Sequence, residues 1–251
     1  MRRCRLVVVA MTLGLLSLPA QAIGLEADGP GVVGQLVDWF VAPAQWHGPA
    51  SLPTRIVEHL YYMTSAMAVA LLIALPVGIG LGHWGRGGLL AINVANMGRA
   101  VPSFGLVILM FLLVGFGFVP VLVALVALAI PPMVTNSYVG MQAVDPAVRT
   151  AAIALGLSRW QRLWQVELPI AMPLVMAGIR TSAVQVLSTA TLAAYVGLGG
   201  LGRYLIDGLA QQQLAQVVGG ALVVAVLAVL LELLLAGLQG LLVSPGLRRN
   251  G

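Results

Sequence analysis

The sequence predicts an all-α membrane protein: a polytopic bundle of about five core transmembrane helices, preceded by a signal peptide or an extra helix. Composition is the first observation, because 60% of the 251 residues are hydrophobic and only 8% are charged, against roughly a quarter in soluble domains. Long apolar runs are the second, since a helix of about 20 apolar residues crosses a bilayer. The third is that the arginines fall mostly between these runs.

Charge, cysteine and histidine content exclude several classes of function. The net charge of +5 comes from scattered arginines, which does not indicate a nucleic-acid-binding face. A single cysteine, Cys4, excludes an intrachain disulfide and a cysteine-based metal site. His47, His59 and His83 are isolated in the sequence. We therefore expect no metal site and no cofactor.

The N-terminus resembles a secretory signal. Three arginines within the first five residues precede an apolar run over 6–18, and an Ala-x-Ala site follows at 20–22. The alternative is an uncleaved first span, although the run is short for one. Residues 1–22 are accordingly a signal peptide or signal-anchor helix. Residues 23–59 form an extracytoplasmic segment with an interfacial helix over 34–42.

The apolar pattern of the remaining chain predicts a membrane domain over 60–243 and a cytoplasmic tail over 244–251. Its spans are expected at 60–81, 101–116, 119–138, 170–195 and 217–243. Pro131-Pro132 is expected to break the third of them. A further interfacial helix is expected over 89–99, and a glycine-rich outer loop over 197–213.

Residues 145–169 form a charged, amphipathic island that predicts two short helices joined at a glycine. Asp145 can cap the first helix, because its carboxylate accepts from free backbone N–H groups. Gly156 suits the left-handed residue that ends that helix. Ser158 and Gln161 have capping-box spacing and start the second helix, which a proline is expected to end. A folded element outside the lipid predicts contact with a soluble partner; the alternative is an ordinary loop between spans.

Two tryptophans in the second helix have two interpretations. Trp160 and Trp164 share one face with Leu157. Large rings can anchor a protein interface. Tryptophans are also enriched at the headgroup level of membranes, and the sequence leaves both alternatives open.

Charge predicts the orientation of the chain. With the 145–169 loop in the cytoplasm, nearly all loop arginines lie inside, as the positive-inside rule requires. Only Arg55 and Arg203 then lie outside. The inside set is Arg2, Arg3, Arg5, Arg86, Arg149, Arg159, Arg162, Arg248 and Arg249.

The 145–169 loop resembles a known motif. Thr150-Ala151-Ala152, Gly156 and Val166-Glu167-Leu168-Pro169 are similar to the E-A-A-x3-G-x9-I-x-L-P loop of permease subunits of binding-protein-dependent ABC importers. Thr150 departs from the glutamate of that pattern. The flanking blocks look like the osmoprotectant subgroup, which imports glycine betaine, choline, carnitine or related quaternary amines. Those blocks lie at 100–104, 131–138, 177–181 and 188–195, within a resemblance that covers about 55–245.

The resemblance implies an ABC importer permease fold and a set of partners. Two permease subunits, identical or different, would form the pathway, two cytoplasmic ATPase subunits would bind the loops, and an extracytoplasmic binding protein would deliver the solute. ATP hydrolysis would lie in the separate ATPase, so this chain would not be an enzyme. The implied coupling residues are Ala151, Ala152 and Gly156 for close docking, Leu168 and Pro169 for a rigid junction to the next span, and Thr150 for a weaker hydroxyl contact.

One side of the 170–195 span is polar. Thr181, Gln185 and Ser188 recur at helical spacing, with Ser182 and Thr189 beside them. Polar groups avoid hydrocarbon, so this side faces protein or water. It is either a wall of the translocation pathway or a set of interhelical hydrogen bonds.

Further pathway candidates follow from cation–π chemistry. A quaternary ammonium favours aromatic faces, and Tyr138 and Tyr195 are the aromatic candidates, with Asn136 beside the first.

Arg180 and Glu232 lie at similar membrane depth, about ten residues from the cytoplasmic end of their spans, or roughly 15 Å. Pairing would lower the cost of burying either charge, so we expect them to pair within or between subunits.

A glycine-rich stretch, 197–202, invites interpretation as a nucleotide loop. No soluble strand precedes it, and it lies on the side expected to lack ATP, so a flexible gate or close packing fits better.

Three hypotheses for the function remain: an ABC importer permease, a stand-alone secondary transporter or channel, and an intramembrane enzyme. The missing carboxylate pairs and histidine clusters argue against the enzyme.

Overall fold

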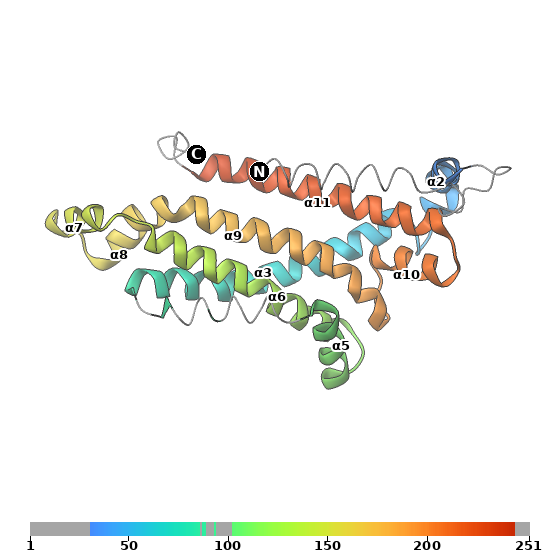
Figure 1. Cartoon of the computed structure of the whole chain (residues 1–251), viewed down its shortest axis with the longest axis horizontal. Coiled ribbons are helices and arrows are strands. Elements are labelled where there is room, and N and C mark those ends of the chain that lie inside the picture. The colour runs from blue at the N-terminus through green and yellow to red at the C-terminus, as the bar shows by residue number, and fades with distance from the viewer. Residues whose placement is uncertain (1–30, 86, 89–92, 94–101, 244–251) are drawn as a thin grey trace, which may run out of the picture.

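The computed structural model describes residues 31–85, 87, 88, 93 and 102–243, and every regular element within them is a helix. Four long helices run side by side along the molecule (Figure 1) and are long and apolar enough to cross a membrane. The 33 residues of α3 and the 29 of α11 correspond to roughly 50 and 44 Å, more than the ~30 Å hydrocarbon layer. The four are α3 (Leu52–Trp84), α6 (Phe118–Gln142), α9 (Leu168–Thr189) and α11 (Leu214–Leu242).

Helix α6 is the centre of the bundle because small residues let α3 and α9 approach it closely. A Cβ atom added to Gly78 of α3 would lie 2.8 Å from the Val134 carbonyl oxygen. A Cβ atom added to Gly178 of α9 would lie 2.8 Å from the Asn136 Cβ atom and 3.0 Å from the Pro132 carbonyl oxygen. Close approach through small residues is typical of helix packing in membranes.

The third span continues through its two prolines, so the expected break is wrong. Side chains one turn later bind the proline carbonyls: the Thr135 hydroxyl donates to Pro131 O at 2.9 Å, and the Asn136 amide donates to Pro132 O at 2.8 Å. These bonds add to the helical ones, because the carbonyl oxygens that lose a helical donor are those of Ala127 and Leu128, four residues before the prolines. The helix persists through the prolines because α3 and α9 pack closely against it.

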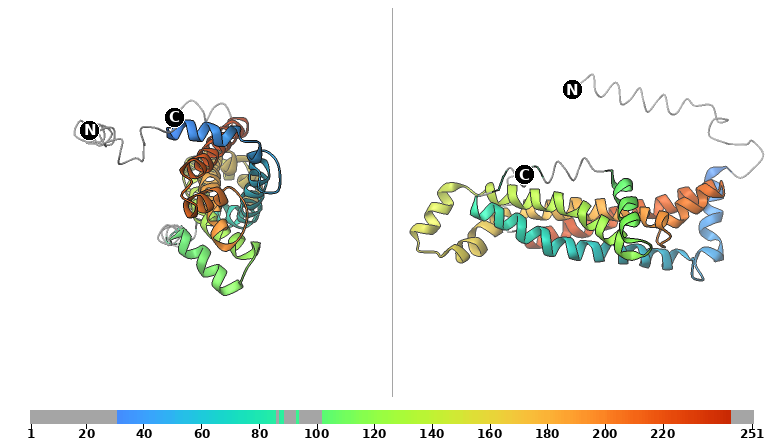
Figure 2. Two further views of the ribbon diagram at one scale, coloured as in Figure 1. Left: turned by 90° about the vertical axis from the view of Figure 1, so that its right-hand side faces the viewer. Right: turned by 90° about the horizontal axis from the view of Figure 1, so that it is seen from below.

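The span expected over 101–116 is shorter than predicted. Helix α5 (Ser103–Val114) has 12 residues, roughly 18 Å, which does not cross a bilayer alone. It lies across the long helices and projects from the bundle (Figures 1 and 2). It begins directly after Pro102, which has an extended backbone.

Two short helices lie at the end of the bundle opposite the 145–169 loop. Helix α2 (Val32–Val41) agrees with the helix expected over 34–42 and crosses the end of the bundle (Figure 2, right). Helix α10 (Gly202–Ala210) lies where a loop was expected. The indole of Trp39 on α2 packs edge-on against the ring of Tyr204 on α10, with ring centroids 5.3 Å apart, so α2 covers the helical part of the expected loop, whereas residues 197–201 are not helical.

Several elements predicted from the sequence lie in parts of the chain that the structure does not describe. The signal or anchor at 1–22, the tail at 244–251 and the helix over 89–99, apart from residue 93, lie outside the described residues.

Replacing Gly178 with alanine should loosen the α6–α9 contact. The added methyl group meets backbone that cannot move aside, so we expect Gly178→Ala to lower the free energy of unfolding by about 1–3 kcal/mol. Thermal unfolding of the purified chain in detergent measures this. Gly237→Ala on α11 is the control, because no atom lies within 4 Å of its added Cβ and alanine is the better helix former. Equal melting temperatures for the two variants would contradict the packing argument.

Candidate functional site: the α7–α8 hairpin and its carboxylate anchor

The 145–169 loop folds into a helical hairpin at one end of the bundle (Figure 1). Its arms are α7 (Pro146–Ala154) and α8 (Arg159–Arg162). The Asp145 carboxylate accepts from the Ala147 N–H at 2.8 Å, and the Ser158–Gln161 capping box is present. Gly156 turns the chain with φ of +79°. These expectations from sequence are confirmed.

The second arm does not end before the next span, contrary to expectation. A π-helical turn, η3 (Leu163–Glu167), joins α8 to α9, and one apolar helical segment runs over Arg159–Val196. The turn lies directly before Pro169, which cannot donate a helical hydrogen bond and whose ring crowds the preceding turn. The hairpin arm and the span therefore form one continuous rod.

A buried carboxylate fixes the hairpin to the bundle. The Glu167 side chain is 1% exposed, and its Oε2 atom lies 2.5 Å from the Nδ1 atom of His83, in the last turn of α3. Its Oε1 atom lies 2.9 Å from Nε of Arg162 on α8 and 3.6 Å from Nε of Arg149 on α7. Burying a carboxylate is costly unless cations and hydrogen bonds compensate it, so these partners are held in place around it.

Two further hydrogen bonds complete this anchor. The Arg149 guanidinium donates to the Met141 carbonyl oxygen at 2.5 Å, and the Gln142 amide donates to the Gly82 carbonyl oxygen at 2.7 Å. Both arms of the hairpin, the end of α3 and the end of α6 are therefore connected. In the sequence, Glu167 is notable only as part of the loop motif. Its position inside an apolar run, five residues after Arg162, was the available signal.

The hairpin presents an apolar tip to its surroundings. Ile153 of α7 and Leu155, the residue that caps its C-terminus, are 56% and 79% exposed, although both are large and hydrophobic. Ala151 and Thr150 are exposed on the same helix, and Ala152 is buried. The Thr150 hydroxyl donates to the Pro146 carbonyl oxygen at 2.9 Å, so its hydrogen is used within α7.

The other predicted coupling residues lie on the second arm. Leu168 is buried and Pro169 is exposed. Trp160 and Trp164 are mostly exposed, with ring centroids 6.3 Å apart. They lie beside α3 and line a groove between α3 and the α8–α9 rod.

The polar side of α9 is open rather than packed. Thr181 and Ser188 are exposed, and Gln185 and Thr189 are partly exposed. Ser182 differs from them: it is buried and its hydroxyl donates to the Ala129 carbonyl oxygen of α6 at 2.8 Å. The interhelical hydrogen bond therefore occurs at Ser182, whereas the pathway wall stays a prediction for the exposed residues.

The remaining pathway candidates are not gathered at one place. Asn136 and Tyr138 lie near the hairpin end of α6, and the Asn136 amide donates within its own helix. Tyr195 lies toward the opposite end, in the 3₁₀ turn η4 (Ala190–Val196), where its ring contacts Phe104 of α5 at 5.0 Å. The structure therefore does not bring the two tyrosines together in one chain.

The two charges at membrane depth are paired. The Nε atom of Arg180 on α9 donates to Oε1 of Glu232 on α11 at 3.1 Å. A residue that the sequence analysis missed, Gln239, accepts from Nη1 of Arg180 at 2.7 Å. This contact ties α11 to the bundle within one subunit.

The glycine-rich stretch is held at the opposite end. The Gly200 N–H donates to the Glu58 carboxylate at 2.7 Å, and Arg55 donates to the same oxygen at 2.9 Å. Glu58 therefore fixes this stretch to the first turns of α3, which agrees with close packing.

Comparison with known proteins identifies the architecture. The sequence profile of the family described as "Binding-protein-dependent transport system inner membrane component" matches residues 70–248, which include the hairpin and both of its flanking spans. The chain belongs to this family. It is thus a multi-pass inner membrane permease of the ABC importer type.

Several permeases are similar along most of their length. Over 191 residues the chain is 34% identical to the glycine betaine/carnitine/choline transport system permease protein OpuCB of Bacillus subtilis, which covers 76% of this chain and 88% of that protein. It is 32% identical to the osmoprotectant import permease protein OsmW of Salmonella typhimurium over 202 residues, 78% of this chain and 94% of that one. These relatives agree with the subgroup that the flanking blocks predict.

The fold agrees with a solved transporter. The inward-facing structure of the MetNI methionine ABC transporter superposes with a TM-score of 0.65 at 19% identity, over 77% of this chain and 96% of that chain. This likeness shows the permease fold.

Removing the Glu167 carboxylate should destabilise the permease. Glu167→Ala leaves two arginines without their partner, so we expect a loss of about 3 kcal/mol in the free energy of unfolding. Thermal unfolding of the purified chain measures it. Asp207→Ala, which breaks the more exposed Arg203–Asp207 pair, should cost less than about 1 kcal/mol. A Glu167→Ala variant as stable as the Asp207 control would show that the anchor contributes nothing.

Proposed function

We propose that this permease forms half of the translocation pathway of an ATP-driven importer for a quaternary-amine osmoprotectant, such as glycine betaine, choline or carnitine. ATP is hydrolysed by a separate cytoplasmic ATPase that docks on the hairpin. An extracytoplasmic binding protein delivers the solute, and a second permease subunit completes the pathway. The observation that carries the proposal is a rigidly anchored hairpin with an exposed apolar tip at one end of the spans.

The hairpin suits a mechanical role for two reasons. Its tip exposes Ile153 and Leu155, and an exposed pair of large apolar side chains is typical of a surface that another protein covers. Its base is locked through Glu167, and α8 continues into α9 through a π-helical turn with no break in the helix. Force applied at the tip would therefore move α9 as a lever rather than bend a loop.

The orientation follows from charge. The arginines of the hairpin and of both chain ends outnumber those of the opposite side, which favours a cytoplasmic hairpin and C-terminus. The ATPase would then meet the hairpin, and the α2–α10 end would face the binding protein.

The solute class is supported by the relatives and by aromatic chemistry. The similar permeases are those of osmoprotectant systems. The exposed ring of Tyr195 beside Phe104 offers a face for a cation near the outer end. Thr181, Gln185 and Ser188 would line the pathway between two subunits, because polar groups exposed on a span avoid lipid.

Charging the hairpin tip should release the ATPase. Leu155→Asp places a carboxylate in an apolar contact, so we expect the ATPase to be lost from the purified complex. The affinity of the permease for the ATPase should fall at least tenfold, which corresponds to ~1.4 kcal/mol of binding free energy. Copurification from membranes measures this. Leu209→Asp, at an exposed leucine of α10, should retain the ATPase. Retention by both variants would contradict docking at the tip.

Transport itself should require ATP and a quaternary amine. Proteoliposomes with this permease, its ATPase and its binding protein should take up labelled glycine betaine or choline only with ATP inside. Tyr195→Ala should slow uptake by about fivefold, since a cation–π contact contributes ~1 kcal/mol, whereas Tyr61→Ala on α3 should not. Uptake of an amino acid such as methionine, without uptake of a quaternary amine, would overturn the proposed solute class.

A further inference from the structure

A long apolar groove lies on the outside of the bundle between α3 and the α8–α9 rod. It encloses about 870 Å³. Its walls include Leu75 and Ile79 of α3 and Met172, Val175 and Ile179 of α9. From Leu168, the first residue of α9, to Ile179, the helix rises roughly 17 Å. The groove therefore runs from the hairpin end of the spans to about the middle of a ~30 Å hydrocarbon layer.

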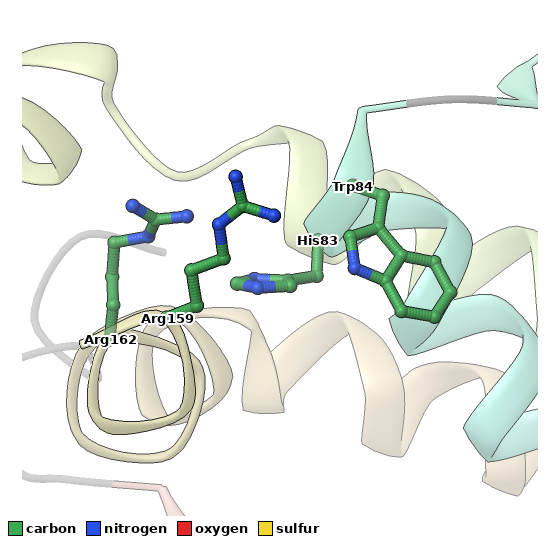
Figure 3. A pocket seen from close by; sticks show the side chains of 4 residues that line it. All are labelled: His83, Trp84, Arg159 and Arg162. Atoms are coloured by element: carbon green, nitrogen blue, oxygen red, sulfur yellow. The ribbon is translucent and has the colours of Figure 1, made fainter.

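The mouth of the groove is cationic. A second cavity of about 520 Å³ adjoins it and is lined by His83, Trp84, Arg159 and Arg162. The first three of these also line the apolar groove. Figure 3 shows the two arginine side chains extending side by side from α8, with the histidine and tryptophan of α3 beside them.

Arg159 is the open cation of this mouth. Arg162 and His83 already face the Glu167 carboxylate. Six arginines lie in the described part of the chain, and among them only Arg159 has no acidic partner within 4.0 Å. An uncompensated arginine beside an apolar groove is complementary to an anion that carries an apolar tail.

We propose that this groove binds an anionic phospholipid of the leaflet that borders the hairpin. One acyl chain lies along the apolar walls, and the phosphate contacts Arg159 at the mouth. Trp84, Trp160 and Trp164 flank the headgroup, where indole rings are enriched. On this proposal the hairpin tryptophans lie at the membrane surface rather than at the ATPase interface. The proposed lipid site does not depend on which solute the transporter carries.

Two other occupants fit the groove less well. A soluble ATPase that docks on the hairpin would not reach Val175 or Ile179, because both lie well within the α9 span. A second copy of the chain has little negative charge to offer at this end: Asp145 caps α7, and Glu167 is buried among its own partners. The phosphate of a lipid supplies the missing charge at the required depth.

Native mass spectrometry of the full-length chain in detergent tests the headgroup contact, with phosphatidylglycerol and phosphatidylcholine as probes. We expect Arg159→Gln to weaken phosphatidylglycerol binding about fivefold, the equivalent of the ~1 kcal/mol that one basic residue contributes near an anionic surface. Phosphatidylcholine binding should not change. Arg203→Gln removes the same charge at the opposite end and should leave both lipids unaffected. Equal losses in the two variants would mean that only overall charge matters, and the site would be wrong.

A second pair of variants tests the groove. Met172→Trp or Ile179→Trp fills it and should reduce the binding of both lipids, whereas Leu222→Trp on the exposed face of α11 should not. A photoreactive side chain at Ile79 in native membranes identifies the occupant directly. Crosslinks to phospholipid support the proposal. Crosslinks to a second copy or to the ATPase, or full lipid binding by both groove-filling variants, overturn it.

Discussion

The hairpin end of this permease depends on one buried carboxylate. Glu167 lies within reach of His83 of α3, Arg149 of α7 and Arg162 of α8. A charge in this position is tolerated only while its partners surround it, so the end of α3 and both arms of the hairpin must keep one arrangement. This constraint makes the hairpin a part of the bundle rather than a loop attached to it.

The rest of the bundle extends this rigidity along its length. The α8–α9 rod passes through a π-helical turn without a break, and Gly178 brings it against α6. Helix α11 is tied less tightly: no residue in its most apolar part is buried, and Arg180 with its partners Glu232 and Gln239 is its polar attachment to α9. Motion at the hairpin would thus be transmitted to α9 first, whereas α11 and the open polar side of α9 are available to a second subunit.

The sequence predicted those features that depend on local chemistry. Four of the five expected spans follow from apolar length, and the caps at Asp145 and Ser158 follow from residue type and spacing. The predicted break at Pro131-Pro132 was wrong because α6 is held between α3 and α9, which pack closely against it at this point through Gly78 and Gly178. Helix α10 was missed because its glycines obscure a helical pattern that Tyr204 stabilises by packing. The partners of Glu167 could not be predicted, since His83 lies 84 residues away along the chain.

The most direct test of this account is the distance between the hairpin and the rod in the assembled transporter. Spin labels at Ala154 on α7 and Ser188 on α9, in a background with Cys4 replaced by serine, report that distance by electron paramagnetic resonance. The account predicts a single narrow distribution that stays narrow with and without nucleotide and becomes broad when Glu167 is replaced by alanine. An equally narrow distribution after that replacement would contradict the claim that the buried carboxylate holds the hairpin.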